Sequence, residues 1–284
     1  AKGTGCEGSI GVCGKTAEIA GIQDEVTGAL IGLAQLAIKT AKEEQAYETI
    51  VEGLFTTLTN VNFDADALDE VLAKIREEKA NVVGASCHCG GDVYGEYNIR
   101  QIWNAEDDVK SLKSLLLFGL RGMAAYAYHA LHLGRKDDAL AKFLCKGLAA
   151  LAENHSTEEL IQLNMDLGEA NLRCMELLDD ANHGTYGAPT PQKVELTIEP
   201  GPFIIITGHD LQDLEELLKQ TEGKGINIYT HGEMLPAHGY PQLKKYKHLK
   251  GNFGTAWQNQ KHEFDGVPAP ILFTTNCLMP QKPS

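Results

Sequence analysis

The chain has 284 residues, of which 43% are hydrophobic and 23% are charged, and its formal net charge is −14. These proportions are typical of a soluble globular protein, and the length has room for two domains. Because no apolar run approaches the length of about 18 residues that a spanning helix needs, we expect no membrane span. The acidic balance argues against a general affinity for nucleic acid or anionic membranes.

The seven cysteines are too few for a disulfide scaffold in a chain of this size. Their odd number fits free thiols or metal ligands in a reducing compartment. The sequence begins at Ala1, without an initiator methionine and without the apolar core of a signal peptide. We therefore expect a cytoplasmic protein.

Two of the cysteines, Cys6 and Cys13, lie in a glycine-rich opening segment. Glycines beside thiolates let the backbone approach an iron–sulfur cluster closely and donate N–H groups to its sulfurs. Such a cluster usually has four ligands, so the other two would lie elsewhere or before Ala1. The alternative is a flexible terminus with two incidental cysteines. We treat residues 1–14 as a separate N-terminal cysteine loop.

Residues 15–183 have helical periodicity and predict an all-helical bundle. Asp64 is a candidate N-cap, residues 156–159 form a capping box, and Asp107 and Asp108 suit the start of a long helix. The residues expected to face the core are Leu30, Leu33, Ala37, Ile38, Ile50, Leu54, Leu58, Leu68, Val71, Leu72, Ile75, Leu112, Leu115, Leu116, Leu120, Met123, Ala127, Leu160, Leu163, Leu167, Ala170 and Leu177, with Cys145 and Cys174 as small core residues.

A loop within this helical region, residues 81–92, contains Cys87, His88 and Cys89. These side chains could bind a metal ion, but they alternate sides in an extended chain. No second pair of ligands follows at the spacing that zinc sites use. The pattern therefore favours a loop without a metal.

The composition changes at residues 184–191, a linker rich in glycine, proline and threonine. Beyond it, in residues 192–284, short apolar runs predict strands over residues 203–206, 226–229 and 271–275, and residues 194–198 alternate. A capped helix over residues 210–219 connects the first two runs into a βαβ unit. We therefore expect a multidomain α and α/β protein, in which the helical bundle precedes a Rossmann-like domain with a parallel sheet.

Three predicted strands are each followed by a side chain that can bind a metal: His209, Glu233 and Cys277. Because parallel strands end at one edge of a sheet, about 4.8 Å apart, these side chains can converge. Imidazole, carboxylate and thiolate together suit zinc or iron rather than Mg²⁺ or Ca²⁺. A mononuclear zinc site could also use His231, although no His-Glu-x-x-His motif is present.

Each of these residues also has a structural alternative. His209 could cap the helix that follows, and His231 could be a surface histidine. Glu233 could be an ion-pair residue, and Cys277 could be a buried thiol. Three ligand types at three strand ends favour the metal site over these alternatives.

Several motifs spread over the whole chain point to one family. They are Gly3-Thr-Gly-Cys6, Gly11-Val-Cys13-Gly-Lys-Thr, Thr56-Thr-Leu-Thr-Asn-Val-Asn-Phe-Asp64, Gly208-His-Asp-Leu211, Thr221-Glu-Gly, Tyr229-Thr-His-Gly-Glu-Met-Leu-Pro-Ala237 and Thr274-Thr-Asn-Cys277. Together they resemble the hybrid cluster protein family, also called prismane proteins or hydroxylamine reductases. The block around Glu233 is the most specific of them.

The resemblance implies roles for five residues. Cys6 and Cys13 would be the last two of four cysteines that bind a conventional N-terminal cluster, [4Fe-4S] or [2Fe-2S]; the Cys-x-x-Cys that precedes them in the family is absent here. His209, Glu233 and Cys277 would be the first three ligands of the hybrid Fe–S–O cluster. The family's other ligands lie in a third domain, which this sequence lacks and which we expect to follow it or to be a separate chain.

The function implied by the resemblance is that of an iron–sulfur oxidoreductase. An external electron donor protein would supply electrons, and a small nitrogen oxide species would be reduced at the hybrid cluster: hydroxylamine to ammonia, or nitric oxide. Three alternatives stay open. They are a non-catalytic scaffold or fragment that needs a partner, an enzyme like nickel–iron carbon monoxide dehydrogenase, and a mononuclear zinc hydrolase.

Overall fold

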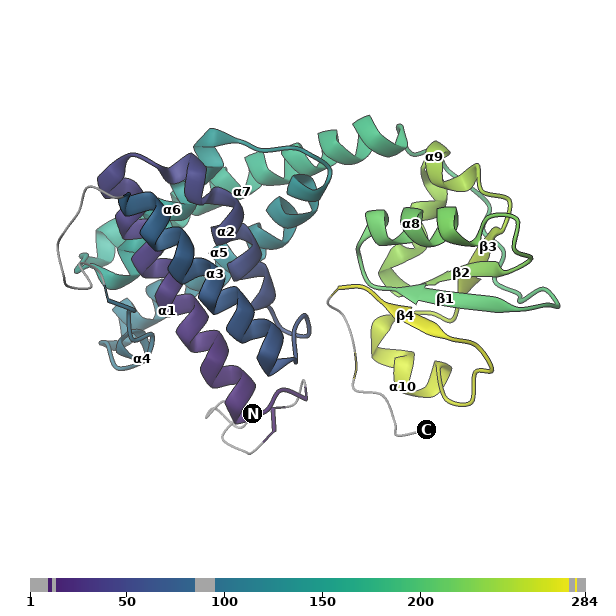
Figure 1. Cartoon of the computed structure of the whole chain (residues 1–284), viewed down its shortest axis with the longest axis horizontal. Coiled ribbons are helices and arrows are strands. Elements are labelled where there is room, and N and C mark those ends of the chain that lie inside the picture. Colours follow the sequence, from purple (N-terminus) through teal and green to yellow (C-terminus); the bar gives the residue numbers. More distant parts are fainter. Residues whose placement is uncertain (1–9, 12–13, 85–94, 276–278, 280–284) are drawn as a thin grey trace. The chain divides into compact units, whose positions relative to one another are not determined.

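The computed structural model describes residues 10, 11, 14–84, 95–275 and 279, and Figure 1 traces the chain. Most of it divides into two compact units, Lys15–Asp179 and Asp180–Ser284. The first unit is helical and the second contains a parallel sheet, so the predicted fold class is confirmed. The division falls inside a long helix, and the domain limits predicted at residues 183 and 192 stay predictions.

Seven helices form the first unit, the last of them extending into the second. They are α1 Ala17–Thr40, α2 Glu43–Thr56, α3 Ala65–Val83, α4 Arg100–Trp103, α5 Asp107–His132, α6 Asp138–Ala152 and α7 Thr157–Tyr186, as far as the described residues go. Asp64 caps α3 by accepting from the N–H groups of Asp66 and Ala67. In the box that opens α7, the Glu159 N–H donates to Ser156 Oγ (3.2 Å) and the Ser156 N–H donates to Glu159 Oε2 (2.8 Å). Both predicted caps are confirmed.

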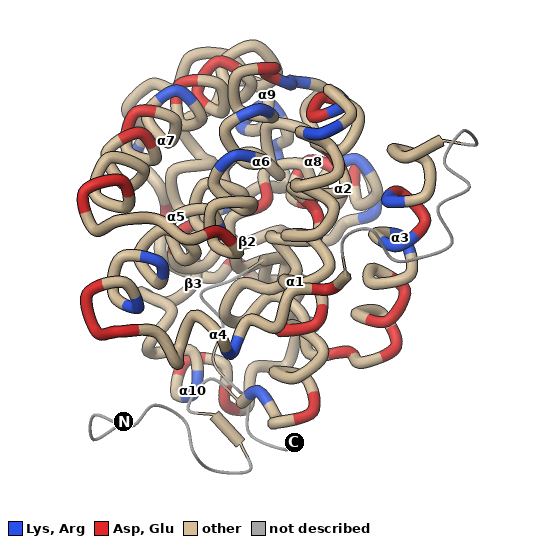
Figure 2. The backbone as a smooth tube through the Cα atoms, turned by 90° about the vertical axis from the view of Figure 1, so that its left-hand side faces the viewer, with Lys and Arg blue, Asp and Glu red and all other residues tan. Residues whose placement is uncertain are grey.

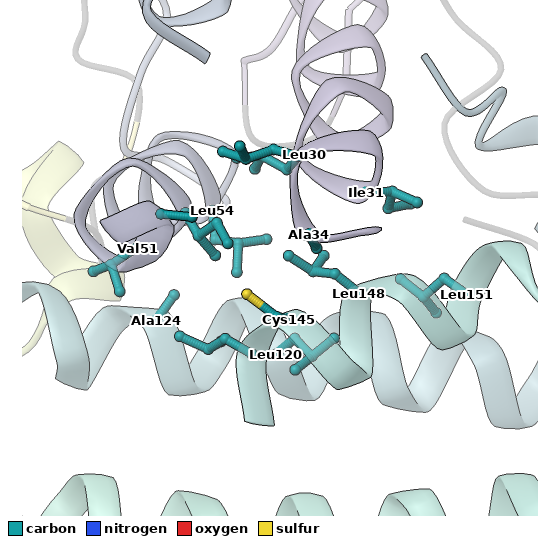
Figure 3. Packing of buried hydrophobic residues seen from close by; sticks show 14 of the residues in the cluster. Leu30, Ile31, Ala34, Val51, Leu54, Leu120, Ala124, Cys145, Leu148 and Leu151 are labelled. Atoms are coloured by element: carbon teal, nitrogen blue, oxygen red, sulfur yellow. The ribbon is translucent and has the colours of Figure 1, made fainter. Parts of the chain in front are cut away.

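The core of the first unit contains most of the residues that the periodicity indicates. Figure 3 shows the Cys145 sulfur among leucine and alanine side chains from several helices. Cys145 and Cys174 are both buried free thiols, and burial raises the pKa of each to about 12. Two expectations were wrong: Ile38 is 43% exposed and Leu115 is 58% exposed.

Most charged residues lie on the surface with both signs mixed; Lys113 and Asp210 are buried exceptions. Figure 2 shows acidic residues along several helices, including α3 and α7, with lysine and arginine between them. Ion pairs such as Lys146–Asp166 (2.9 Å) and Lys136–Glu48 (3.0 Å) are exposed, and exposed pairs contribute roughly 0–1 kcal/mol. The packed apolar core therefore holds the helical unit together. None of the described helices combines the length and apolar character of a membrane-spanning segment.

The second unit is built on a four-stranded parallel sheet in the order β3-β2-β1-β4. Its elements are β1 Phe203–Thr207, α8 Leu211–Thr221, β2 Asn227–His231, the 3₁₀ helix η1 Gly232–Gly239, α9 Pro241–Lys244, β3 Leu249–Phe253, the 3₁₀ helix η2 Trp257–Asn259, α10 Gln260–Glu263 and β4 Ile271–Phe273. The helix α8 connects β1 to β2, as the βαβ pattern predicts. The inner strands β1 and β2 are the more deeply buried ones, which fits the continuous apolar run at residues 203–206 of β1.

Two parts of this sheet differ from the sequence-based expectation. The edge strand β3 was not predicted, because its residues 249–253 include Lys250 and Gly251 and neither alternate nor form an apolar run. The alternating segment 194–198 forms no strand; only Glu195 pairs, through an isolated bridge to Gly251. A Cβ at Gly251 would lie 2.1 Å from the Glu195 carbonyl oxygen, so this contact requires glycine.

Candidate metal centre

The register of the sheet brings the two described candidate ligands to equivalent positions. Thr207, the last residue of β1, pairs with His231, the last residue of β2. His209 and Glu233 each follow these residues by two positions. Because neighbouring parallel strands lie about 4.8 Å apart, both residues follow the carboxyl edge of the sheet at equivalent chain positions.

A tight turn after β1 positions His209. Gly208 has φ +118°, and a Cβ there would lie 2.1 Å from Thr274 Oγ1, so the turn requires glycine. The His209 N–H donates to Thr275 Oγ1 (2.8 Å), which also lies 3.5 Å from His209 Nδ1. Two threonines after β4 thus fix the half-buried histidine. His209 is not the helix cap, because Asp210 accepts from the first N–H groups of α8 (2.8 and 3.0 Å).

Glu233 follows a second glycine turn. Gly232 has φ +61° and begins η1, and Glu233 is half-buried in its first turn. Its Oε2 atom is buried and has no hydrogen-bond partner among the described residues. A buried carboxylate oxygen is costly without a donor or a cation. This orphaned oxygen therefore fits a cation ligand better than an ion-pair residue.

His231 is neither a surface residue nor an available ligand. Its side chain is 0% exposed, its Nδ1 lies 3.1 Å from Thr207 Oγ1, and its Nε2 lies 2.9 Å from Glu263 Oε2. Both ring nitrogens are therefore engaged, which corrects the surface interpretation and removes His231 from the possible zinc ligands.

Glu263, the partner of His231, was not found from the sequence. It ends α10, and its carboxylate also accepts from the Thr255 hydroxyl (2.5 Å) and the Thr255 N–H (3.2 Å). Burial alone would raise the pKa of Glu263, but the hydrogen bonds from Thr255 and His231 outweigh burial and hold that pKa below its usual value. Glu263 is therefore a carboxylate at neutral pH, and no local motif distinguishes it from a surface glutamate.

The remaining candidates lie outside the described residues. These are Cys6, Cys13, Cys87, His88, Cys89 and Cys277. Within the described part of the chain, no three His, Cys, Asp or Glu side chains form a metal site. The donor set of His209 and Glu233 fits iron or zinc as a partial shell, with the predicted thiolate of Cys277 as a third member.

The sequence matches the Prismane/CO dehydrogenase family over residues 2–284. The chain belongs to this family. This prismane-family chain is 47% identical over 306 residues to a hydroxylamine reductase from Solidesulfovibrio magneticus, and 47% identical over 309 residues to one from Syntrophobacter fumaroxidans. Each match covers 100% of the chain and 56% of the relative. The chain thus spans just over half the length of these curated relatives.

A solved structure also matches the prismane-family chain weakly. It is the as-isolated, Ni-free carbon monoxide dehydrogenase from Thermococcus sp. AM4, at 15% identity and a TM-score of 0.35, covering 97% of this chain and 44% of that one. This likeness is too low to support an argument about the fold.

Proposed function

We propose that this chain supplies part of the iron centre of an oxidoreductase. The substrate of this enzyme is either hydroxylamine, which is reduced to ammonia, or nitric oxide. The orphaned Glu233 carboxylate oxygen carries the proposal, because it lies at the same sheet edge as His209 and in an equivalent register position. Relatives at 47% identity that carry the name hydroxylamine reductase support the reaction class.

The residues that would hold the iron are few. His209, Glu233 and Cys277 would bind a hybrid Fe–S–O cluster, and Cys6 and Cys13 would bind a conventional cluster, [4Fe-4S] or [2Fe-2S]. The relatives are longer than this chain, and we assign the other ligands to a further domain or a separate chain. When bound, the iron would supply a Lewis acid and a path for electrons.

His209 and Glu233 have distinct tasks in this proposal. Because Nδ1 of His209 faces Thr275 Oγ1 (3.5 Å), Nε2 is the ring nitrogen that would bind the metal. Glu233 would bind the iron through Oε2, the buried oxygen without a partner among the described residues. The reaction of hydroxylamine with two electrons and two protons gives ammonia and water, and an external donor protein supplies the electrons.

Metal analysis tests the proposal. Protein purified without oxygen is assayed for iron, acid-labile sulfide and zinc, and its intact mass is compared with 30.9 kDa. We expect iron and sulfide, with less iron in His209→Ala and Glu233→Ala. The matched control is Glu199→Ala, which removes an exposed ion pair with Lys250 (3.0 Å) in the same unit. Zinc without iron, or a Glu233→Ala variant with wild-type iron content and spectra, would overturn the proposal.

A further inference from the structure

A buried hydrogen-bond network anchors the end of β2, directly before the candidate ligand Glu233. His231 bridges Thr207 on β1 and Glu263 on α10, and its ring packs edge-on against Phe264 with centroids 4.6 Å apart. Because Glu263 is ionised and can only accept, His231 Nε2 donates to it. The other ring nitrogen, Nδ1, faces the Thr207 hydroxyl. The network therefore holds the His231 ring at both nitrogens.

The carboxylate in this network is itself held in place. Thr255 donates to Glu263 through its N–H and its hydroxyl, and Asn259 Nδ2 donates to Thr255 Oγ1 (2.8 Å). Gly254 makes room for the pair, since a Cβ there would lie 2.6 Å from Glu263 Oε2 and 3.0 Å from His231 Cδ2. Glu263 is thus a rigid acceptor, with its side chain 19% exposed.

The Glu233 side chain is less restrained than this network. Its Oε2 has no hydrogen-bond partner in the described part of the chain, and Gly232, with φ +61°, separates it from His231. The backbone of residues 231–233 sets the position from which this side chain extends. That backbone is fixed on one side by the ring of His231.

We propose that Glu263 is a positioning residue for Glu233, acting through His231, so that the Glu233 carboxylate points at the metal before the metal arrives. The proposal rests on the proposed function in taking Glu233 as a ligand. The claim that Glu263 holds residues 231–233 in place, which we call the mechanical part, concerns the metal-free chain alone. Some residues do not touch the metal but orient its ligands through hydrogen bonds. Removing such a residue typically lowers metal affinity by about 10- to 100-fold.

NMR of the metal-free, full 284-residue chain tests the mechanical part. In the wild type and in Glu199→Ala, we expect one His231 tautomer and backbone order parameters of about 0.85 at Gly232 and Glu233. In Glu263→Ala the tautomer becomes mixed and the order parameters fall below about 0.6. Glu263→Gln, whose amide oxygen still accepts from Nε2–H, restores both. Unchanged order parameters in a folded Glu263→Ala variant would overturn the proposal.

Thr207→Val gives a second route should Glu263→Ala fail to fold. It keeps the side-chain shape and removes only the hydroxyl bonded to Nδ1, and the order parameters at residues 232 and 233 should fall in the same direction. If the order parameters stay at the wild-type value, the His231 ring does not hold residues 232 and 233 in place. Glu263 then cannot act on Glu233 through His231.

Anaerobic titration with ferrous iron alone separates this proposal from the proposed function. Wild type and Glu199→Ala should bind alike, Glu263→Ala about 10- to 100-fold more weakly, and Glu263→Gln nearly as the wild type does. If the wild type binds no iron, the proposed function fails while the NMR result still decides the mechanical part. If Glu263→Ala loosens residues 232 and 233 but binds iron like the wild type, the positioning proposal fails and the proposed function stands.

Discussion

Two glutamates at the carboxyl edge of the sheet have opposite surroundings. Glu263 accepts hydrogen bonds from His231 and from Thr255, whereas Glu233 Oε2 is buried without a partner in the described structure. An unsatisfied buried acceptor costs about 1–3 kcal/mol, and more for a charged group. Glu233 therefore lowers the stability of the metal-free chain, as residues kept for function often do.

The same substitution at these two positions should have opposite effects on stability. We expect Glu233→Ala to leave the free energy of unfolding of the metal-free chain unchanged or to raise it by about 1 kcal/mol. Glu263→Ala should lower it by about 1.5–3 kcal/mol, because hydrogen bonds to a charged group are lost. Urea unfolding measures both values. An equal loss in the two variants would show that Glu233 is satisfied in the folded chain.

At the residue scale, the sequence predicted which candidate ligands follow the strand ends, but not the hydrogen bonds between distant residues. His209 and Glu233 could be selected because each lies within a few residues of the end of a predicted strand. The role of His231 could not, because its partner Glu263 lies 32 residues later and the pair forms only when α10 packs beside β2. His231, for which a surface position and a zinc ligand were the alternatives, is instead buried and bonded through both ring nitrogens.

At the scale of elements, local signals predicted most of the fold. The residues that form a helix cap or a 3.6-residue apolar pattern lie close together in the sequence. The helices and the βαβ unit could therefore be predicted directly. The strand β3 could not, since its pairing depends on β2 and on the approach of the distant Glu195 carbonyl to Gly251. Edge strands with glycine and lysine carry little local signal.

The turn between β1 and α8 gives a prediction with an internal control. Gly208 and Gly201 have similar φ values, +118° and +125°, but only Gly208 has atoms where a Cβ would lie. Gly201→Ala should cost about 1 kcal/mol from backbone strain, and Gly208→Ala about 2–4 kcal/mol, because a clash with Thr274 is added. Thermal unfolding of both variants measures the difference. Equal losses would mean that the turn relaxes around the new methyl group.

At the scale of the whole molecule, buried titratable groups make the stability of the protein depend on pH. His238 is buried beside Thr230, with Nε2 2.9 Å from Thr230 Oγ1. Burial lowers the pKa of His238 below 6.5, and a hydrogen bond to the Gly251 backbone only partly opposes this. The pKa of Glu263 is also lowered, so its contribution begins to be lost as the pH falls through about 4.5 and is gone below its folded-state pKa.

The sign of the histidine effect follows from proton linkage. Below pH 6.5 the unfolded chain protonates this histidine before the folded chain does, so the free energy of unfolding falls as the pH falls, by at most about 1.4 kcal/mol per pH unit. His238→Gln should remove this part of the slope between about pH 6.5 and 5. The exposed His262→Gln is the control. Urea unfolding at several pH values measures the slopes, and a wild-type slope in His238→Gln would contradict the assignment.

The pairing of Thr207 with His231 has a further consequence. Since each candidate ligand follows its strand end by the same two residues, the spacing between them is counted in rungs of the β-ladder. Such a spacing changes only in steps: the loss of one residue from either strand would move its ligand by about 3.3 Å and turn it to the other face of the sheet. If His209 and Glu233 are ligands, the lengths of β1 and β2 and of the short turns that follow them are therefore constrained, whereas connections farther from this edge can change in length.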